Sequence, residues 1–553
     1  MLIQRNGIGG GGGGGASSYT DLTDTPAAYY AKRLVKYNAA GTGLTYTYDI
    51  PYYITDYGAV ADGQEVSNGA ITSGTATLTS ASNPFTSADV GKQVIVTGAG
   101  SGGGQLATTI AAYVNAGQVT LTINASSTVS SSQVSWGTDN TSAIQSTIDA
   151  VSIARGGRII VPIGRFLCTG VLDFKRLPDG VNITRSSVTF VGEVQGPFEA
   201  RSGSLNYSPG QYDLAPVLMI TNTATPFMSF NAINVIVDSI MFYYPNQIRP
   251  TNGTGTVTST TTTPVVYPFT VDMTYLSAGC HVRNCTFANS YDMIRAYGGR
   301  HSFDTIIAGN LRVGFEIDRT LDVTRIKNIH GYPIYDLLGG YGGIGSTLQT
   351  FVYSNSICIL VYRADQLLLH DVFWYACGTG IQLDSDAYGA SYGSATNVEF
   401  DFCRVGLKAI TTQSTGWDFV NYGVAGNTIH GGDTAFIIGD GATSPKVNIQ
   451  GGKIYGSFTN KVVKNSGVAT IENVREYNNS TALITTPSMP ASTNTYTNEY
   501  AYRARVYISG GTVTQVSHRG SVTGLTSGCL VVAPGETISI TYSSAPSWVW
   551  MGM

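Results

Sequence analysis

The chain has few charges. Asp, Glu, Lys and Arg supply 12% of its 553 residues, half of the average for soluble domains, which is about 25%. The 31 basic and 35 acidic side chains give a net charge of −4, and no basic block is present that could neutralise a run of phosphates. Nucleic acid is therefore excluded as an expected partner.

Long apolar segments are also lacking. No stretch approaches the ~20 residues needed to span a bilayer, and the N-terminal sequence MLIQRNGIGGGGGGG lacks the apolar region of a signal peptide. We expect a soluble chain that is synthesised in a cytoplasm, does not insert into a membrane and is not exported by a standard signal.

Cysteine is scarce and irregularly spaced. Seven cysteines, an odd number without a CxxC pair, exclude a disulfide framework and a zinc ribbon. Cys280 and Cys285 flank His281, but the repeat described below places both thiols in a core, where free cysteine behaves as a small hydrophobe. We therefore expect no metal and no cofactor.

Glycine, serine and threonine are abundant, which is typical of an all-β protein. Helical periodicity is convincing only over 138–151, behind Thr138 and Asp139 as capping candidates. Thr, Ser, Gly and Val alternate over about 66–135 between Gly-rich turns, which predicts a small inserted β domain. The uninterrupted glycine run 9–15 is too flexible to hold one conformation alone, so we expect residues 1–50 to form an attachment segment.

An internal repeat occupies the middle of the chain. Nine ten-residue windows share an apolar third residue, a mostly apolar sixth residue, and a fifth residue that is often Asn, Ser, Thr, Asp or Gly. They are VIVDSIMFYY from 235, CHVRNCTFAN from 280, HSFDTIIAGN from 301, LDVTRIKNIH from 321, LLLHDVFWYA from 367, VEFDFCRVGL from 398, WDFVNYGVAG from 417, VNIQGGKIYG from 447 and ATIENVREYN from 469.

This pattern fits two short strands on either side of a turn, each placing an apolar residue in a common core. A unit of about 20 to 22 residues with β alternation predicts a parallel β-solenoid, with rungs about 4.8 Å apart. Cys285 and Cys403 would occupy inward sixth positions, and Cys280 a first position.

The order of the motifs resembles a known family. DYGAVADG from 56, TDNT from 138, AIQ from 143, GG from 156 and VPIG from 161 resemble the N-terminal part of the pectate-lyase-like, single-stranded right-handed β-helix proteins. The insertion at about 66–135, with YPNQ from 244, RNCTF from 283 and GRH from 299, resembles the form carried by bacteriophage tailspikes.

The resemblance implies a homotrimer that is fixed to tail or baseplate proteins of a virion by its N-terminal part. It also implies a β-helix that binds, and usually cuts, a bacterial surface polysaccharide such as capsule or O-antigen. The same superfamily hosts lyases, hydrolases and plain binders, so the fold alone does not decide the chemistry.

We therefore predict an all-β, homotrimeric protein built on a right-handed parallel β-helix, with an inserted β domain and a C-terminal β cap. The predicted parts are an attachment segment over 1–50, the start of the β-helix over 51–157 with the insertion (about 66–135) and a capping helix (138–151), the β-helix over 158–490, and a C-terminal β domain for trimerisation or glycan binding over 491–553. The aromatic tail with Trp548 and Trp550 belongs to the last part.

The repeat predicts a carboxylate patch on one outward face. Windows aligned as above place Glu399 one rung from Asp418, and Asp401 two residues along from Glu399, with His370 and Arg404 nearby. Glycoside hydrolysis needs two carboxylates, roughly 5 to 9.5 Å apart, one of which is kept protonated. A solvated polar face or a calcium site is the alternative explanation.

A second carboxylate set is formed by Glu316 and Asp318 of GFEIDR, with Asp384 and Asp386 of a later rung. Beside it, a Gly- and Tyr-rich loop over 331–355 could wall a glycan groove, because sugar rings stack on aromatic faces. The candidate substrate-binding residues are His370, Arg404, Trp374, Tyr332, Tyr335, Tyr341, Arg300 and His301.

Other activities remain open. A lyase needs a base and cations against a uronate, which Arg300 with His301, or His370 with Arg404, could supply. An esterase is disfavoured because the chain lacks a GxSxG elbow and has six histidines. The expected function is a tailspike that hydrolyses a surface polysaccharide; the alternatives are a non-catalytic receptor-binding spike, a structural spike and a polysaccharide lyase.

Overall fold

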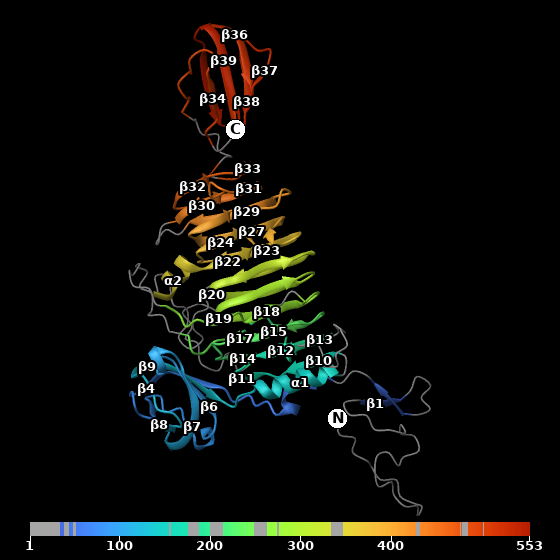
Figure 1. Cartoon of the computed structure of the whole chain (residues 1–553), viewed down its shortest axis with the longest axis vertical. Coiled ribbons are helices and arrows are strands. Elements are labelled where there is room, and N and C mark those ends of the chain that lie inside the picture. Colours follow the sequence, from blue (N-terminus) through green and yellow to red (C-terminus); the bar gives the residue numbers. More distant parts are fainter. Residues whose placement is uncertain are drawn as a thin grey trace, which may run out of the picture.

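A computed structural model of the chain describes residues 34–37, 44–47, 51–153, 156–174, 187–198, 214–247, 263–273, 276–332, 347–426, 432–475, 477, 485–500 and 503–552. Within them, 23 strands form one continuous sheet, and neighbouring strands in it pair in parallel. The strands wind around a common core as a parallel β-helix, which occupies the middle of the molecule in Figure 1.

The rungs stack in three columns, named here the first, second and third stacks. Seven long strands contribute to more than one stack, because the chain turns without leaving the sheet. They are β19 (His281–Gly298), β20 (Ser302–Thr320), β21 (Thr324–Gly331), β23 (Leu367–Tyr375), β27 (Gly393–Cys403), β29 (Trp417–Gly426) and β31 (Lys446–Gly456).

The remaining strands belong to a single stack each. The first stack adds β3 (Tyr52–Tyr53), β10 (Gly157–Val161), β13 (Val188–Gly192), β16 (Ile236–Asp238) and β33 (Val468–Glu472). The second adds β11 (Gly164–Cys168), β14 (Pro216–Ile220) and β17 (Met241–Tyr243). The third adds β12 (Leu172–Phe174), β15 (Met228–Phe230), β18 (Val271–Met273), β22 (Ile357–Val361), β24 (Thr379–Leu383), β28 (Val405–Ala409), β30 (Gly432–Ile438) and β32 (Phe458–Lys464).

The predicted fifth position of the repeat is the turn between the first and second stacks. Asn284, Asp371 and Asn421 each occupy it with a positive φ of 52° to 54°. Asn and Asp tolerate this left-handed conformation better than other residues with a Cβ. The Asn421 amide also donates to Asn397 Oδ1 of the rung before, at 3.0 Å, so the turn residues are linked from rung to rung.

Seven of the nine predicted windows are in register and two are displaced. Ser302 pairs with Arg325, so the window from 321 starts three residues early. Leu367 pairs with Gly393, so the window from 398 starts five residues late. Both displaced windows still carry apolar residues at their third and sixth positions, so the apolar pattern alone does not distinguish them from the true register.

The inserted segment folds into a closed barrel beside the first rungs (Figure 1). Its strands are β4 (Gln64–Ile71), β5 (Thr77–Ser80), β6 (Gln93–Val96), β7 (Leu106–Asn115), β8 (Gln118–Leu121) and β9 (Val129–Gly137), and three short 3₁₀ helices lie at Ile54–Tyr57, Ser87–Asp89 and Ser101–Gly103. It occupies the part of the chain where the sequence predicts a small β domain.

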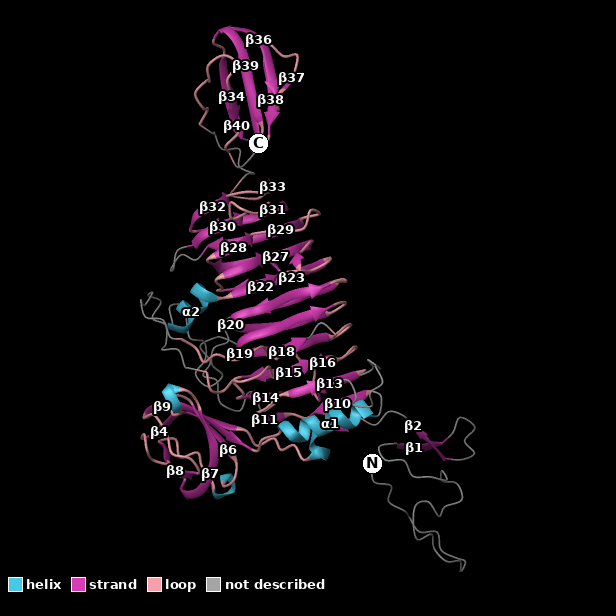
Figure 2. Ribbon diagram, viewed as in Figure 1, coloured by secondary structure: helices cyan, strands magenta, loops and turns pink. Residues whose placement is uncertain are grey.

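Helix α1 (Thr141–Ile153) covers the N-terminal end of the β-helix, as Figure 2 shows. It begins three residues later than predicted, because Asp139 lies outside it and accepts the Thr141 N–H at 3.0 Å. Ile144 and Ile148 are buried in the solenoid core. A second helix, α2 (Thr347–Asn355), packs against the side, where Leu348 contacts Leu311 of β20.

The C-terminal strands form two antiparallel sheets beyond β33 (Figure 1). One contains β34 (Thr495–Thr497), β39 (Thr537–Ser544), β36 (Thr512–His518) and β37 (Ser521–Val522), and the other β38 (Gly528–Val532), β35 (Ala504–Ser509) and β40 (Ser547–Gly552). Trp548 and Trp550 are buried in the core of this unit.

Two small pairings complete the described residues. Strands β1 (Leu34–Tyr37) and β2 (Leu44–Thr47) form a hairpin within the predicted attachment segment, and β25 (Ser385–Asp386) and β26 (Gly389–Ala390) form another. In the part of the chain that is described, neither α1 nor α2 is long and apolar enough to cross a membrane.

Candidate functional site

The outward side of the second stack changes along the β-helix. In the first rungs it is apolar and covered by the barrel, where Ile95 of β6 packs with Met219, Met241 and Tyr243. These outward positions are hydrophobic because their side chains pack against a second domain, the barrel. The rungs beyond the barrel carry polar and aromatic residues at the equivalent positions, so this part of the face is where a ligand can bind.

One row of outward residues crosses four of these later rungs. Phe373, Glu399, Gly423 and Lys453 are register partners on β23, β27, β29 and β31. All four line a cavity of about 310 Å³. The row therefore places an aromatic ring, a carboxylate and a cation around one cavity.

Two donors contact the same oxygen of Glu399. Tyr455 Oη donates to Glu399 Oε1 at 2.7 Å, and Lys453 Nζ lies 2.9 Å from the same atom. The Lys453 ammonium also lies 4.5 Å from the centroid of the Tyr455 ring. Burial, and then the contact with Glu399, raise the pKa of the Tyr455 hydroxyl, which keeps it a hydrogen-bond donor.

The other oxygen of Glu399 faces Gly423. A Cβ on Gly423 would lie 3.2 Å from Glu399 Cγ and 3.4 Å from Oε2. No described residue donates a hydrogen bond to Oε2. The glycine therefore keeps open the space in which this oxygen could hold a water molecule or a sugar hydroxyl.

Asp401 lies two residues after Glu399 on β27, on the same outward face. Two residues of a strand span about 7 Å. Burial raises the pKa of the Asp401 carboxyl, and the charge of Glu399 raises it further. The two carboxyls thus have different surroundings: Glu399 contacts a cation and a hydroxyl donor, whereas Asp401 is held toward its protonated form.

Aromatic side chains flank this pair. The rings of Tyr375 and Phe402 are stacked with centroids 5.6 Å apart, and Tyr375 is the register partner of Asp401. The ring centroids of His330 and of Phe373 on the next rung lie 5.6 Å apart. Half-buried rings beside carboxylates can stack on the C–H faces of sugars while the polar groups bind hydroxyls.

Gly423→Ala is expected to fill the space beside Glu399 Oε2 without unfolding the chain, and so to reduce any glycan cleavage at this site. The new Cβ enters the space beside Glu399 Oε2, and no positive φ forbids alanine there. We expect turnover to fall by about tenfold or more, because a misplaced reactive group loses much of its effective concentration. Initial rates and the unfolding temperature, measured on both proteins, test this; full activity in the alanine variant would show that the space beside Oε2 is not needed for cleavage.

Asp418 was paired with the wrong residue. It is the register partner of Ser394, and Glu399 pairs with Gly423 instead. Asp418 therefore lies in the first stack, before the turn at Asn421, and its Oδ1 accepts the Asn448 amide at 3.0 Å. The error follows from the displaced window at 398.

His370 and Arg404 are also separate from the pair. His370 lies in the first stack as the register partner of Thr396, and its Nδ1 is 2.8 Å from the exposed Asp371. Arg404 follows the end of β27, where its backbone N–H donates to Cys377 and Gly378 carbonyls. Neither lines the cavity beside Glu399.

The second predicted carboxylate set lies in the third stack and is partly buried. Asp318 is 2% exposed; its Oδ2 accepts from Arg319 Nε at 3.0 Å and its Oδ1 from the Arg363 N–H at 3.3 Å. Burial raises the pKa of Asp318, and the charge of Asp386 raises it further. Burial likewise raises the pKa of the Glu316 carboxyl. Its neighbour in the set, Asp318, is instead held in an internal ion pair with Arg319.

Asp384 is not beside that pair. Ile317 pairs with Val361, which pairs with Leu383, so Asp384 lies two rungs from Asp318. Its carboxylate accepts the Gln382 amide at 3.1 Å and the Ser385 N–H at 2.8 Å. These contacts close the strand end and leave Asp384 outside a two-carboxylate site.

Two predicted substrate-binding residues are in the core. Trp374 is 3% exposed, and its ring packs edge-to-face against that of Phe315, with centroids 6.3 Å apart. His301 is fully buried; its Nδ1 accepts the Cys280 N–H at 3.3 Å, and its Nε2 lies 2.7 Å from the Tyr297 carbonyl. Both side chains therefore point into the core and not toward a ligand-binding surface.

The predicted aromatic loop is described only at its ends. Tyr335 and Tyr341 lie outside the described residues. Tyr332 packs beside His330, with centroids 5.1 Å apart, and the end of the segment is helix α2. Arg300 is exposed and lines a larger groove elsewhere on the β-helix.

The described side chains contain no group of three or more His, Cys, Asp or Glu residues that could hold a metal ion. Cys280, Cys285 and Cys403 are buried free thiols, and burial raises the pKa of each. Their inward positions agree with a packing role.

Four residues of this site were not predicted from the sequence: Lys453, Tyr455, Gly423 and Phe373. The signal was present, because the window from 447 is in register and its seventh residue, Lys453, is outward. With the window from 398 moved by five residues, Lys453 and Glu399 fall in one row. The missed residues were hidden by the register error and not by a lack of pattern.

No protein-family model matches the chain, and no curated protein matches it. Solved structures do share its parallel β-helix. A tailspike protein of the Acinetobacter baumannii bacteriophage Fri1, a capsular polysaccharide depolymerase, is 11% identical, covers 75% of this chain and 82% of its own, and gives a TM-score of 0.32. The tailspike protein of the Acinetobacter phage vB_ApiP_P1 is 11% identical with coverages of 75% and 76% and a TM-score of 0.32. An α-1,3-glucanase from Streptomyces thermodiastaticus is 10% identical with coverages of 78% and 85% and a TM-score of 0.30. The likeness is one of fold, at low identity.

Proposed function

We propose that the chain binds a polysaccharide along the second stack and hydrolyses it at Glu399 and Asp401. The observation that carries this proposal is the pair of outward carboxyls two residues apart on β27, in contrasting surroundings and between aromatic rings. Environments that push two carboxyls toward different protonation states assign an acid and a base. A merely solvated polar face does not require this contrast.

In this mechanism Asp401 is the general acid. Its raised pKa favours the protonated form, which donates a proton to the glycosidic oxygen as the bond to the sugar breaks. Glu399 is the general base: Oε1 is held by Lys453 and Tyr455, and Oε2 takes the proton of a water that attacks the anomeric carbon. The proton given by Asp401 leaves with the new hydroxyl of the departing sugar; Glu399 then releases the proton taken from water to solvent, and Asp401 takes up a proton from solvent.

The spacing favours inversion at the anomeric carbon. Inverting enzymes separate the two carboxyls by about 6.5 to 9.5 Å to admit a water, whereas retaining enzymes hold them about 5 to 5.5 Å apart. Two residues along a strand give about 7 Å. The open space beside Gly423 is where such a water would lie.

A polysaccharide lyase is the second candidate, and Lys453 is the observation that favours it. An ammonium beside Glu399 could offset the carboxylate of a uronic acid while a base removes the adjacent proton. Lys453 is already paired with Glu399 at 2.9 Å, so it has less to offer a substrate, and hydrolysis is our first choice.

We further propose that the chain is a bacteriophage tailspike: a homotrimer of the virion tail that attaches through residues 1–50 and binds capsule or O-antigen. The insertion at about 66–135, with YPNQ from 244, RNCTF from 283 and GRH from 299, resembles tailspikes and supports this proposal, as does an exposed apolar row on the C-terminal sheet. Val549 and Met551 of β40 are 42% and 43% exposed. Their strand pairs with β35, and a face of this kind suits contact with another copy.

The test is depolymerisation of candidate substrates. Purified chain is incubated with capsular and O-antigen polysaccharides, and fragment size, reducing ends and the ultraviolet absorbance of unsaturated uronates are followed. We expect shorter fragments without that absorbance, and an inverted anomer in the first product seen by NMR. Fragments with the absorbance would indicate a lyase, and binding without fragments would indicate a non-catalytic spike.

A further inference from the structure

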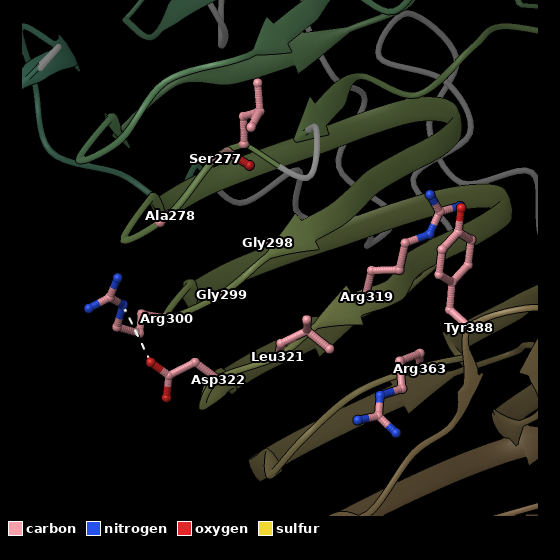
Figure 3. Close-up of a pocket in the computed structure, with 11 residues that line it drawn as sticks. Ser277, Ala278, Gly298, Gly299, Arg300, Arg319, Leu321, Asp322, Arg363 and Tyr388 are labelled. Atoms are coloured by element: carbon pink, nitrogen blue, oxygen red, sulfur yellow. Dashed lines mark ion pairs between the residues drawn. The ribbon is translucent and has the colours of Figure 1, made fainter. Parts of the chain in front are cut away.

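A second hollow lies away from Glu399, where the third stack turns back into the first. It is a groove of about 890 Å³, within the usual size of ligand sites. Arg300, Arg319 and Arg363 line it together with Leu321 and Tyr388. Figure 3 shows Leu321 between Arg300 on one side and Arg319 with Tyr388 on the other.

Each arginine is anchored through one nitrogen. Arg319 Nε donates to Asp318 at 3.0 Å, and Arg363 Nη2 donates to Asp365 at 3.0 Å. Arg300 Nε lies 3.5 Å from Asp322 Oδ2, and both side chains are more than half exposed. A guanidinium carries five N–H donors. Each of these arginines therefore keeps N–H groups that can bind a ligand.

Aromatic stacking fixes the central arginine. The Arg319 guanidinium lies 3.9 Å from the centroid of the Tyr388 ring and 4.7 Å from that of Tyr297. Tyr388 projects from the turn between β25 and β26 and is 60% exposed. A planar cation that contacts two aromatic rings is preorganised for bidentate binding.

The groove also has an apolar wall. Leu321 is 64% exposed, although it is a large aliphatic residue. Gly298 and Gly299 remove side chains from the surface beside it: a Cβ would lie 1.9 Å from the Ser277 carbonyl oxygen in one case and 3.0 Å from Asp322 Cβ in the other. An exposed leucine and tyrosine beside arginine forks suit a ligand with a C–H face and an acidic group.

We propose that this groove is a second, non-catalytic glycan site that binds a sugar carrying a carboxylate, such as a uronic or sialic acid. Arginine forks bind carboxylates bidentately, Leu321 and Tyr388 contact the sugar ring, and Asp322 accepts hydroxyl donors. The three aspartates that anchor the arginines balance their charge, which disfavours a polyphosphate. The site lies on other stacks than Glu399 and goes beyond the proposed hydrolysis, because binding here requires no cleavage.

Calorimetry on the full chain tests this with three acidic probes: trigalacturonate, a hyaluronan tetrasaccharide and sialyllactose. We expect at least one to bind, with an affinity that falls as salt rises, and the methyl ester of that probe not to bind. Arg300→Gln removes a charged donor and should weaken binding about tenfold. Tyr388→Ala should weaken it similarly, while Tyr388→Phe keeps the ring and the affinity.

The matched control is Arg325→Gln, an exposed arginine on β21 outside the groove, which should bind as the parent does. Arg319 is left unchanged, because its loss would leave the buried Asp318 carboxylate without its ion-pair partner. Glu399→Gln should leave this binding intact whether or not the chain hydrolyses glycans. Equal affinity for acid and ester, unchanged affinity in Arg300→Gln, loss of binding in Glu399→Gln, or no binding of any of the three probes would each overturn the proposal.

Discussion

Glu399→Gln and Asp401→Asn should each lower the rate of polysaccharide cleavage by about 10² to 10⁴, the usual contribution of a general acid or base. Both substitutions keep the size of the side chain and remove its ability to transfer a proton. Glu399→Gln keeps an acceptor for Tyr455 and Lys453 at the Oε1 position but leaves no base beside the open space at Gly423. Initial rates on the polysaccharide that the wild type degrades measure the effect.

The two variants should differ on a substrate with a good leaving group. An activated aryl glycoside needs little protonation of the leaving oxygen, so Asp401→Asn should recover much of its activity on it, whereas Glu399→Gln should not. This separates an acid from a base in a way that a structural role for either residue would not reproduce.

The pH dependence has a definite sign. The raised pKa of Asp401 places the loss of the acid on the alkaline side of the rate profile. Because the charge of Glu399 contributes to that rise, Glu399→Gln should move the alkaline limb of its residual activity to lower pH. A limb that stays in place would show that the two carboxyls are not coupled.

Stability provides the control for folding. A carboxyl whose folded pKa is raised stabilises the fold below its unfolded pKa, and this contribution is lost as pH rises through the folded value. At neutral pH, Asp401→Asn should therefore be at least as stable as the wild type while it is inactive. Asp418→Asn, across the turn and bonded to Asn448, is the matched carboxylate and should keep full activity. If Glu399→Gln and Asp401→Asn retain activity, the site is wrong and Glu316 becomes the next candidate.

The repeat made the β-helix predictable because its physical requirements recur in every rung. An inward apolar residue and a turn residue that accepts positive φ must appear each time, as Asn284 and Asn421 do. The apolar residues at two positions of each window do not fix the register, however. A shift of five residues at one window still placed apolar residues inward, yet it paired Glu399 with Asp418 and hid Lys453.

Of the residues in the arginine groove, Arg300 alone was predicted from the sequence to bind a ligand, and the others could not be predicted for a different reason. Its residues come from the ends of separate rungs and from the turn between β25 and β26, and the stacking of Arg319 on Tyr388 joins positions almost seventy residues apart. Such contacts depend on how irregular segments fold back on the rungs. The repeat carries no information about them.

Gly331→Ala is expected to destabilise the chain strongly, because Gly331 makes room for Trp374 on the next rung. A Cβ on Gly331 would lie 2.2 to 2.4 Å from Trp374 Cγ, Cδ2 and Cε2. The indole cannot move away, since it is buried against Phe315, and Gly314 sits at its far edge. Overpacking of this kind costs about 1 to 3 kcal/mol or more, and Trp374→Ala should cost about 3 to 5 kcal/mol through the cavity it leaves.

The double variant Gly331→Ala/Trp374→Leu tests the contact itself. Leucine at 374 lacks the ring atoms that clash with the new methyl group, so the double variant should be more stable than the sum of the single effects predicts. Unfolding midpoints and unfolding rates in urea measure this coupling, with Gly441→Ala as a glycine control because a Cβ there meets nothing within 4 Å, although its positive φ of 95° adds a modest strain. Folded Trp374→Leu should bind glycan as tightly as the wild type, because the indole belongs to the core. Weaker glycan binding at unchanged stability would instead return Trp374 to the ligand-binding surface.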